Sequence, residues 1–236
     1  MNIPAIATPH TSAAFDADLI EIRGIVADMA GRAERALRAS VEALAGMDRE
    51  RAAAIVAGDR EIDALNEQHE KSIIRTIALR APMADDLREL IVAIRLGSQL
   101  ERAGDQAKGI ARRVHGVGPE FCARFEPLLG RMTELAAEMI ADANLAFQSR
   151  DVALARSVRR RDRALNALFD ELTAALIGQM SEEPRRVSAG SHLLSIAKQI
   201  ERVGDYATKI ADNVCYMVTG EHFADWRDGP ALAPVG

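Results

Sequence analysis

Residues 101–114 read ERAGDQAKGIARRV, and residues 201–214 read ERVGDYATKIADNV. The two stretches are identical at eight of 14 positions and lie 100 residues apart. A weaker echo pairs the Asp-Arg dipeptide at 59–60 with the one at 162–163. Repetition at a fixed distance is typical of a duplicated structural unit. The repeat therefore predicts that the two halves of the chain share one fold.

Helical periodicity continues on both sides of each copy. Apolar residues recur at steps of three and four, and the prolines leave long uninterrupted stretches between them. Pro82 should end one helix, Asp85 or Asp86 should cap the next, and Gly220 should end the last. The predicted helices span residues 16–47, 48–80, 85–115, 125–149, 151–180 and 187–219.

These segments predict an all-α fold of two tandem, pseudo-symmetric three-helix bundles with six long antiparallel helices. Short connections make neighbouring helices antiparallel. We assign residues 15–116 to the first bundle and residues 117–220 to the second. Residues 1–14 and 221–236, which carry prolines and no helical period, are predicted to be flexible tails.

The composition excludes several classes of protein. The 236 residues are 48% hydrophobic, 28% charged and 4% aromatic, with a net charge of −5. The apolar content is too high for a disordered chain, and the few aromatics disfavour a β-sandwich or barrel. The acidic balance argues against a nucleic-acid binder.

Cysteine content and hydropathy indicate the cellular compartment of the protein. Cys122 and Cys215 are too few for a disulfide framework. We see no charged leader followed by an apolar stretch, and no apolar run that approaches the length of a membrane span. We therefore expect a cytoplasmic protein.

Each copy of the repeat places two carboxylates one helical turn apart. Glu101 and Asp105 lie on one flank of a helix, beside the stripe of apolar residues that faces the core. Lys108 and Arg112 extend the same flank in the first copy, where they could simply neutralise the pair. The first copy is therefore an ambiguous cation site.

The second copy is more acidic along the same flank. Glu201, Asp205, Thr208 and Asp212 supply three carboxylates and no lysine or arginine. Oxygen ligands of this kind suit magnesium, calcium, manganese or iron. The alternative is a solvated acidic face balanced by arginines.

A single strip cannot surround a metal ion, so neighbouring helices must contribute ligands. Candidates at spacings of four lie on the fourth predicted helix, which offers Glu138 and Asp142 together with Glu134. The first predicted helix offers Glu34 and Asp28. Carboxylates from facing helices build metal sites in bundles, although each of these residues is otherwise an ordinary surface acid.

The duplicated motif, the repeat and the length together resemble the PhoU family. The matching stretches include Glu101-Arg-Ala-Gly-Asp105, Glu201-Arg-Val-Gly-Asp205, the Pro82–Arg88 helix entry and the Val218–Glu221 end, and the resemblance covers almost the whole chain. The sequence departs from the pattern at positions 109 and 209, where many members carry Asn.

The resemblance implies a non-catalytic regulator that restrains high-affinity phosphate uptake and the phosphate-starvation response when phosphate is plentiful. It implies two partners: the ATPase subunit of the phosphate ABC transporter and a PAS-containing sensor histidine kinase. We also expect a homodimer, no nucleic-acid partner, and contact with the membrane only through these partners. Divalent or trivalent ions such as iron, zinc, manganese or magnesium are implied at Glu101, Asp105, Glu201 and Asp205.

Two other functions stay open. A di-iron carboxylate enzyme would explain acidic strips in a bundle, but the Glu-x-x-His pairs typical of such sites are missing. A helical scaffold with empty acidic faces is the other alternative. The arginine-rich run at 156–163 indicates either a solvated face or a docking surface for an acidic partner. No phosphate-binding loop or candidate nucleophile supports nucleotide binding or covalent catalysis.

Overall fold

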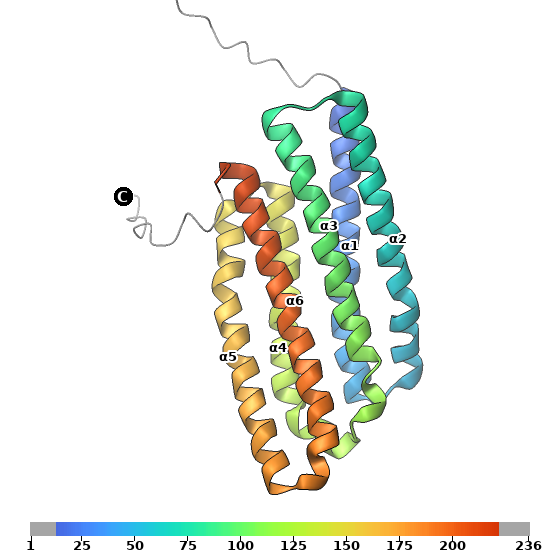
Figure 1. Ribbon diagram of the computed structural model, residues 1–236, viewed down its shortest axis with the longest axis vertical. Coiled ribbons are helices and arrows are strands. Elements are labelled where there is room, and N and C mark those ends of the chain that lie inside the picture. The colour runs from blue at the N-terminus through green and yellow to red at the C-terminus, as the bar shows by residue number, and fades with distance from the viewer. Residues whose placement is uncertain (1–12, 222–236) are drawn as a thin grey trace, which may run out of the picture.

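The computed structural model describes residues 13–221, and these form six long α helices, two short 3₁₀ turns and no strand. This arrangement confirms the predicted all-α fold of two three-helix bundles (Figure 1). The helices are α1 (Ala13–Ala45), α2 (Arg49–Arg80), α3 (Ala84–Ala111), α4 (Pro119–Ser149), α5 (Val152–Glu182) and α6 (Val187–Thr219). The 3₁₀ turns are η1 (Val114–Gly116) and η2 (Pro184–Arg186).

Side-chain caps start two of the helices. Asp48 accepts a hydrogen bond from the amide of Arg51 at the start of α2, and Asp151 accepts bonds from two amides at the start of α5. These bonds satisfy amide groups that the first turn of a helix leaves without partners. Gly220 ends α6 with a positive φ of 78°, as its sequence position predicts.

The ends of α3 differ from the prediction. Met83 is the N-cap residue and makes no capping bond, so Asp85 and Asp86 lie in the first turn instead of capping it. There they still face the positive end of the helix dipole. The helix ends at Ala111, and the chain tightens into η1, which ends at Gly116.

The start of α4 also differs from the prediction, because the helix begins at Pro119 instead of near residue 125. Proline suits the first turn of a helix, where its missing N–H would have no partner.

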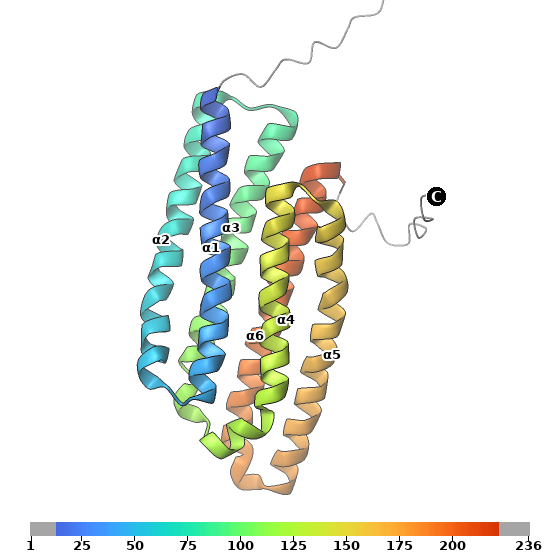
Figure 2. The ribbon, with the colours of Figure 1, turned by 180° about the vertical axis from the view of Figure 1, so that it is seen from behind.

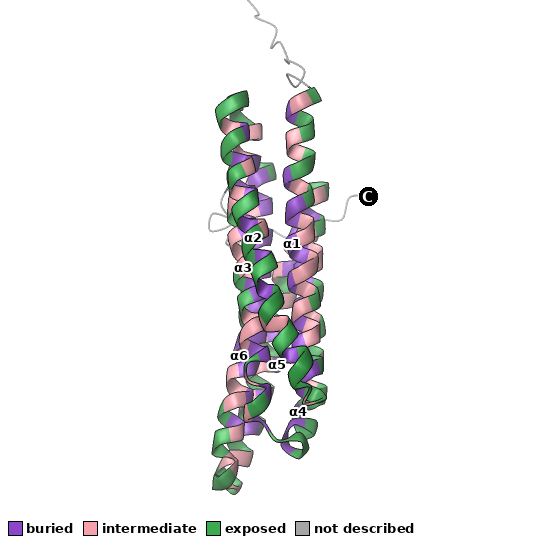
Figure 3. Cartoon of the chain, turned by 90° about the vertical axis from the view of Figure 1, so that its right-hand side faces the viewer, coloured by how far each residue is buried: buried purple, intermediate pink, exposed green. Residues whose placement is uncertain are grey.

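Helices α1, α2 and α3 pack against one another, as do α4, α5 and α6. The two bundles meet where α1 packs on α4 and α3 packs on α6, and α2 and α5 lie at the two outer edges (Figures 1 and 2). Seen from the side, exposed residues face outward and buried residues line the inside (Figure 3). One continuous set of buried residues runs through both bundles.

The predicted tails fall outside residues 13–221, except for Ala13 and Ala14, which already belong to α1, and Glu221, which follows α6. Among the described residues, no helix is both long and apolar enough to cross a bilayer.

Candidate functional site

The two copies of the repeat lie on α3 and α6, and each turns its acidic flank toward the outer helix of its own bundle. On α3 the flank meets α2, and on α6 it meets α5. We call these clusters the first strip (Glu101, Asp105 and Lys108 with Asp59 and Asp63) and the second strip (Glu201, Asp205 and Thr208 with Asp162 and Asn166). The helices that face the acidic flanks are thus α2 and α5, instead of α1 and α4, which pack on other faces of α3 and α6.

The glycine inside each copy brings these helices together. A Cβ atom on Gly104 would lie 2.8 Å from Ile62 Cδ1 of α2, and one on Gly204 would clash with Leu165 Cδ2 of α5. Both contacts are too short for a side chain. The glycines therefore hold the carboxylates of the repeat within reach of polar groups on α2 and α5.

In the first strip a lysine lies among the carboxylates. Lys108 Nζ forms an ion pair with Asp59 of α2 and lies 3.2 Å from Asp105 Oδ1. The Asp59 side chain is only 4% exposed, so its charge depends on this partner. The hydrogen bond to Asp59 is the main cause that raises the pKa of Lys108.

The surroundings of Glu101 and Asp63, two further carboxylates of the first strip, disfavour their charged forms. Burial raises the pKa of Glu101, and the negative charges of Asp63 and Asp105 raise it further, although Asn66 Nδ2 donates to Glu101 Oε2 at 2.6 Å. Burial and the charge of Asp59 raise the pKa of Asp63 in the same way. The first strip is crowded with negative charge even with Lys108 in place.

The second strip has the same plan without the lysine, since Thr208 occupies the position of Lys108. Asp162 of α5 accepts a hydrogen bond from Asn166 (Nδ2–Oδ2, 3.1 Å). Burial raises the pKa of Asp162, and the charge of Asp205 raises it further. Among residues 13–221, neither Asp162 nor Asp205 forms an ion pair.

Four side-chain oxygen atoms of the second strip are buried without a hydrogen-bond partner in the described part of the chain: Asp162 Oδ1, Asn166 Oδ1, Thr208 Oγ1 and Glu201 Oε2. Glu201 Oε2 has an ionic partner, since it lies 2.6 Å from Lys198 Nζ. The Thr208 hydroxyl lies close enough to Asp162 to lower the pKa of that carboxyl. Buried polar atoms without partners are costly, so they indicate a group that the protein alone does not supply. Oxygen donors with net negative charge fit a hard cation such as Mg²⁺, Mn²⁺ or Ca²⁺.

The other acidic residues singled out by the sequence pair with arginines. Arg159 of α5 binds both oxygens of Asp212 at 2.9 and 2.8 Å, so α5 supplies the cation that the α6 flank itself lacks. Arg161 of α5 pairs with both Glu138 and Asp142.

On α1, Arg38 pairs with Glu34 and also contacts Glu134 of α4. The structure does not bring Glu34, Glu138 or Asp142 into ion pairs or hydrogen bonds with the repeated motif.

Sequence reasoning missed Asp59, Asp63, Asp162 and Asn166 as members of the strips. The repeated Asp-Arg dipeptide at 59–60 and 162–163 was the signal that could have found two of them. Within the described residues, no three His, Cys, Asp or Glu side chains converge closely enough to hold a metal ion.

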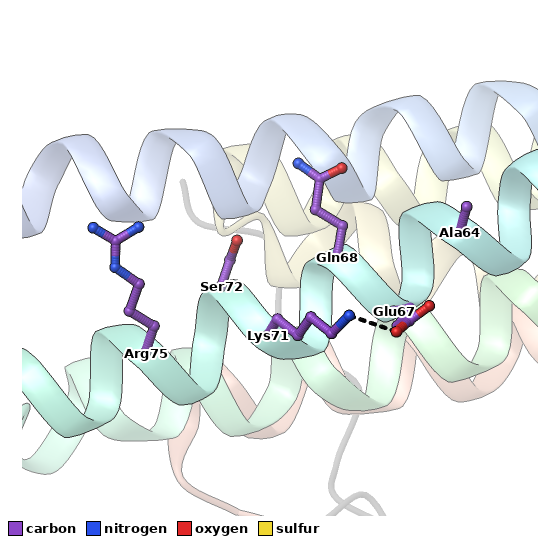
Figure 4. Close-up of a pocket in the computed structure, with 6 residues that line it drawn as sticks. All are labelled: Ala64, Glu67, Gln68, Lys71, Ser72 and Arg75. Atoms are coloured by element: carbon purple, nitrogen blue, oxygen red, sulfur yellow. Dashed lines mark hydrogen bonds and ion pairs between the residues drawn. The ribbon is translucent and has the colours of Figure 1, made fainter.

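Other surfaces offer little catalytic chemistry. The pocket in Figure 4 is lined only by α2 residues, among them Lys71, which pairs with Glu67, and Ser72, which has no neighbouring histidine there. Both cysteines are buried, and burial raises the pKa of the Cys122 thiol to about 11. A thiol with such a pKa is a poor nucleophile at neutral pH.

The sequence pattern that defines the PhoU domain matches this chain twice, over residues 26–114 and 129–214. This chain belongs to the PhoU family. Each match lies within one bundle, covers most of it and contains one copy of the repeat, so the PhoU domain corresponds to the duplicated structural unit.

Curated PhoU relatives align with nearly the full length of the chain. A protein of Zymomonas mobilis named phosphate-specific transport system accessory protein PhoU homolog is 40% identical, over 94% of each chain. A protein of the same name from Rhizobium meliloti is 37% identical, over 89% of this chain and 90% of its own length.

Solved PhoU structures share the fold. The crystal structure of PhoU from Pseudomonas aeruginosa matches with a TM-score of 0.81 at 28% identity, and covers 88% of this chain and 100% of that one. The phosphate transport system regulatory protein PhoU from Streptococcus pneumoniae matches with a TM-score of 0.82 at 29% identity, over 88% and 98% of the chains.

Proposed function

We propose that this protein is a non-catalytic regulator of phosphate transport, which restrains high-affinity uptake and the phosphate-starvation response when phosphate is plentiful. The observation that carries the proposal is full-length similarity to relatives named phosphate-specific transport system accessory proteins. The two-bundle fold, with its wide outer helical faces, suits an adaptor that binds other proteins.

The proposed partners are the ATPase subunit of the phosphate ABC transporter and a PAS-containing sensor histidine kinase. Two features of the chain support an adaptor over an enzyme: its cysteine thiols are buried and have raised pKa values, and Asp142 and Asp212 are paired with arginines. The cytoplasmic location and the homodimer remain predictions.

Deletion and complementation test this regulatory role. In phosphate-rich medium, a deletion strain should take up more phosphate and express a starvation-induced reporter, and the wild-type gene should reverse both effects. Unchanged uptake and unchanged reporter expression in the deletion strain would contradict the proposal.

We also propose that the second strip binds a divalent cation. Its support is the cluster of buried side-chain oxygens of Asp162, Asn166 and Thr208 beside Asp205, in which the two carboxylates form no ion pair among residues 13–221. A bound cation would neutralise the carboxylates and hold α5 against α6, so its role would be to stabilise the fold.

Metal analysis tests the second-strip site. The D162N/D205N double variant should lose the metal that wild-type protein retains when it is purified without chelator. The matched control E171Q, which changes an exposed carboxylate on the same helix α5, should retain it. Equal metal content in all three proteins would contradict a site at the second strip.

A further inference from the structure

The first strip carries a cation of its own. The ammonium group of Lys108 lies between Asp59 of α2 and Asp105 of α3, with Asp63 and Glu101 contributing further negative charge close by. The Lys108 side chain is 22% exposed, so its charge is held largely inside the strip. This ammonium occupies the space between α2 and α3 where a metal ion would have to contact the same carboxylates.

The second strip shows the same arrangement without a lysine at the position of Lys108. Thr208 stands where Lys108 stands, and Asp162 stands where Asp59 stands. Of the neighbouring lysines, Lys209 Nζ lies over the Tyr206 ring, 5.1 Å from its centroid, and Lys198 pairs with Glu201, whereas among residues 13–221 no lysine pairs with Asp162 or Asp205. The difference between Lys108 and Thr208 therefore separates a strip whose aspartate on the outer helix is paired with a lysine from one whose equivalent aspartate is not.

We propose that Lys108 is the resident counter-cation of the first strip, so that this chain binds one divalent cation, in its second bundle, instead of one in each bundle. The number of bound ions rests on the proposed second-strip site, whereas the role of Lys108 does not.

The physical reason is that the Lys108 ammonium, which is part of the chain, has an advantage over a free metal ion in binding Asp59. The Lys108 ammonium is attached to α3 and pays no translational entropy to reach Asp59, unlike an ion from solution. A divalent ion entering beside it would meet a positive charge at close range, in surroundings where screening is weak. To bind, the ion would have to expel Lys108 and leave the ammonium without its buried partner.

The test asks whether removal of Lys108 creates a metal site. The parent protein is D162N/D205N, in which the second strip is disabled, and K108T is added to it because threonine is the residue of the second strip. Mn²⁺ is titrated into the folded full-length proteins by calorimetry. We expect no binding by the parent and gain of one Mn²⁺ site in the K108T protein, with an affinity at least about tenfold higher than any residual binding of the parent.

Two further variants keep the result interpretable. K108R retains the positive charge and should gain no site, whereas K108M removes the charge without adding an oxygen and should gain a weaker one. If loss of the ion pair unfolds the K108T protein, recovery of its helical circular dichroism on addition of Mn²⁺ provides the same evidence.

Three outcomes would overturn the role of Lys108. The first is K108T binding Mn²⁺ no better than its parent. The second is a parent that binds Mn²⁺ and loses it when D59N/D105N is added, since the first strip would then be a site despite Lys108. The third is a K108T protein that stays unfolded with Mn²⁺ present while K108M folds and binds none. If wild-type protein binds no Mn²⁺, the second-strip proposal fails, and the K108T comparison still decides the role of Lys108.

Discussion

Asp59 illustrates how strongly one side chain in this fold depends on one partner. Its side chain is 4% exposed and its ionic partner is Lys108, a residue of the neighbouring helix. A carboxylate in such a place is tolerated only because an ammonium lies against it. At the residue scale, the two strips thus differ in whether the aspartate on the outer helix has an ionic partner.

Substitution of Asp59 by alanine should lower the free energy of unfolding by about 2 kcal/mol, because Lys108 keeps only Asp105 as a partner. This corresponds to a fall in Tm of roughly 4–8 °C in a calorimetric scan with EDTA present. The control is Asp105→Ala, whose side chain is 48% exposed and which should cost less than about 1 kcal/mol. Equal losses in the two variants would contradict a buried ion pair at Asp59.

The raised pKa of Glu101 predicts that the stability of the protein depends on pH. Burial raises its pKa above the unfolded value of 4.5, so the stability it contributes is fully present below that value and is lost as the pH rises through the folded pKa. Glu101→Gln should therefore stabilise the protein by about 0.3–0.5 kcal/mol at pH 7 and leave it unchanged near pH 3.5, as measured by urea unfolding.

Glu67 is the opposite case and provides the control. Its hydrogen bond to Lys71 lowers its pKa, so its contribution is present above the unfolded value and is lost as the pH falls. Glu67→Gln should destabilise slightly or not at all at pH 7. A Glu101→Gln protein that is less stable than wild type at pH 7 would show that its hydrogen bond with Asn66 outweighs the repulsion.

At the scale of elements, the two strips depend on how closely neighbouring helices approach. Gly104 and Gly204 occupy equivalent places in the repeat, and each faces a buried apolar side chain of the outer helix. The duplicated sequence therefore encodes a helix contact together with a pair of carboxylates. Loss of the contact should move the carboxylates away from α2 or α5.

Substitution of Gly204 by alanine should destabilise the protein by about 1–3 kcal/mol, because Leu165 is fully buried and has no room to withdraw. The matched control is Gly178→Ala on α5, where a Cβ atom would meet nothing within 4 Å. That variant should gain about 0.5–1 kcal/mol from the better helix propensity of alanine. Chemical denaturation measures both, and a neutral Gly204→Ala would contradict the close approach of α5 and α6.

At the scale of the whole molecule, the two bundles behave as one folding unit in this structure. Their buried residues form one continuous core, and α1 and α3 pack on α4 and α6. A polar link crosses the same interface: Glu89 of α3, with a side chain 4% exposed, pairs with Arg23 of α1 and with Arg150 at the end of α4. We expect a single cooperative unfolding transition.

Substitution of Glu89 by alanine should cost about 2–4 kcal/mol, because two arginines lose a buried partner. The transition should stay single in differential scanning calorimetry, since the apolar core still joins the bundles. Glu61→Ala removes a pair within one bundle, to Arg32, where the Glu61 side chain is 66% exposed, and should change stability little. Two separate transitions in the Glu89→Ala protein would show that this ionic link, instead of the core, couples the bundles.

Much of the fold was predictable because its signals are local. Helical periodicity and Pro or Gly breaks predicted all six helices, and α6 runs from Val187 to Thr219 as expected. The start of α4 was missed, since Pro119 belongs to the first helical turn, where its lack of an amide proton costs nothing. The end of α3 was placed four residues late because the periodic pattern does not distinguish a 3₁₀ turn from an α-helical one.

The candidate site was predictable only in part. The repeat identified Glu101, Asp105, Glu201 and Asp205 as residues that share a flank, since residues four apart on a helix must do so. It could not show that Arg159 of α5 reaches Asp212, because that contact joins residues of two helices.

The sequence by itself determined that this chain is two copies of one helical unit, with a carboxylate pair repeated at a spacing of 100 residues. Only the tertiary structure decided which neighbours meet each pair: Asp59 and Lys108 in one bundle, Asp162 and Thr208 in the other. The reason is that helix geometry is set by bonds between residues near in sequence, whereas the choice of facing helix depends on the packing of the whole core.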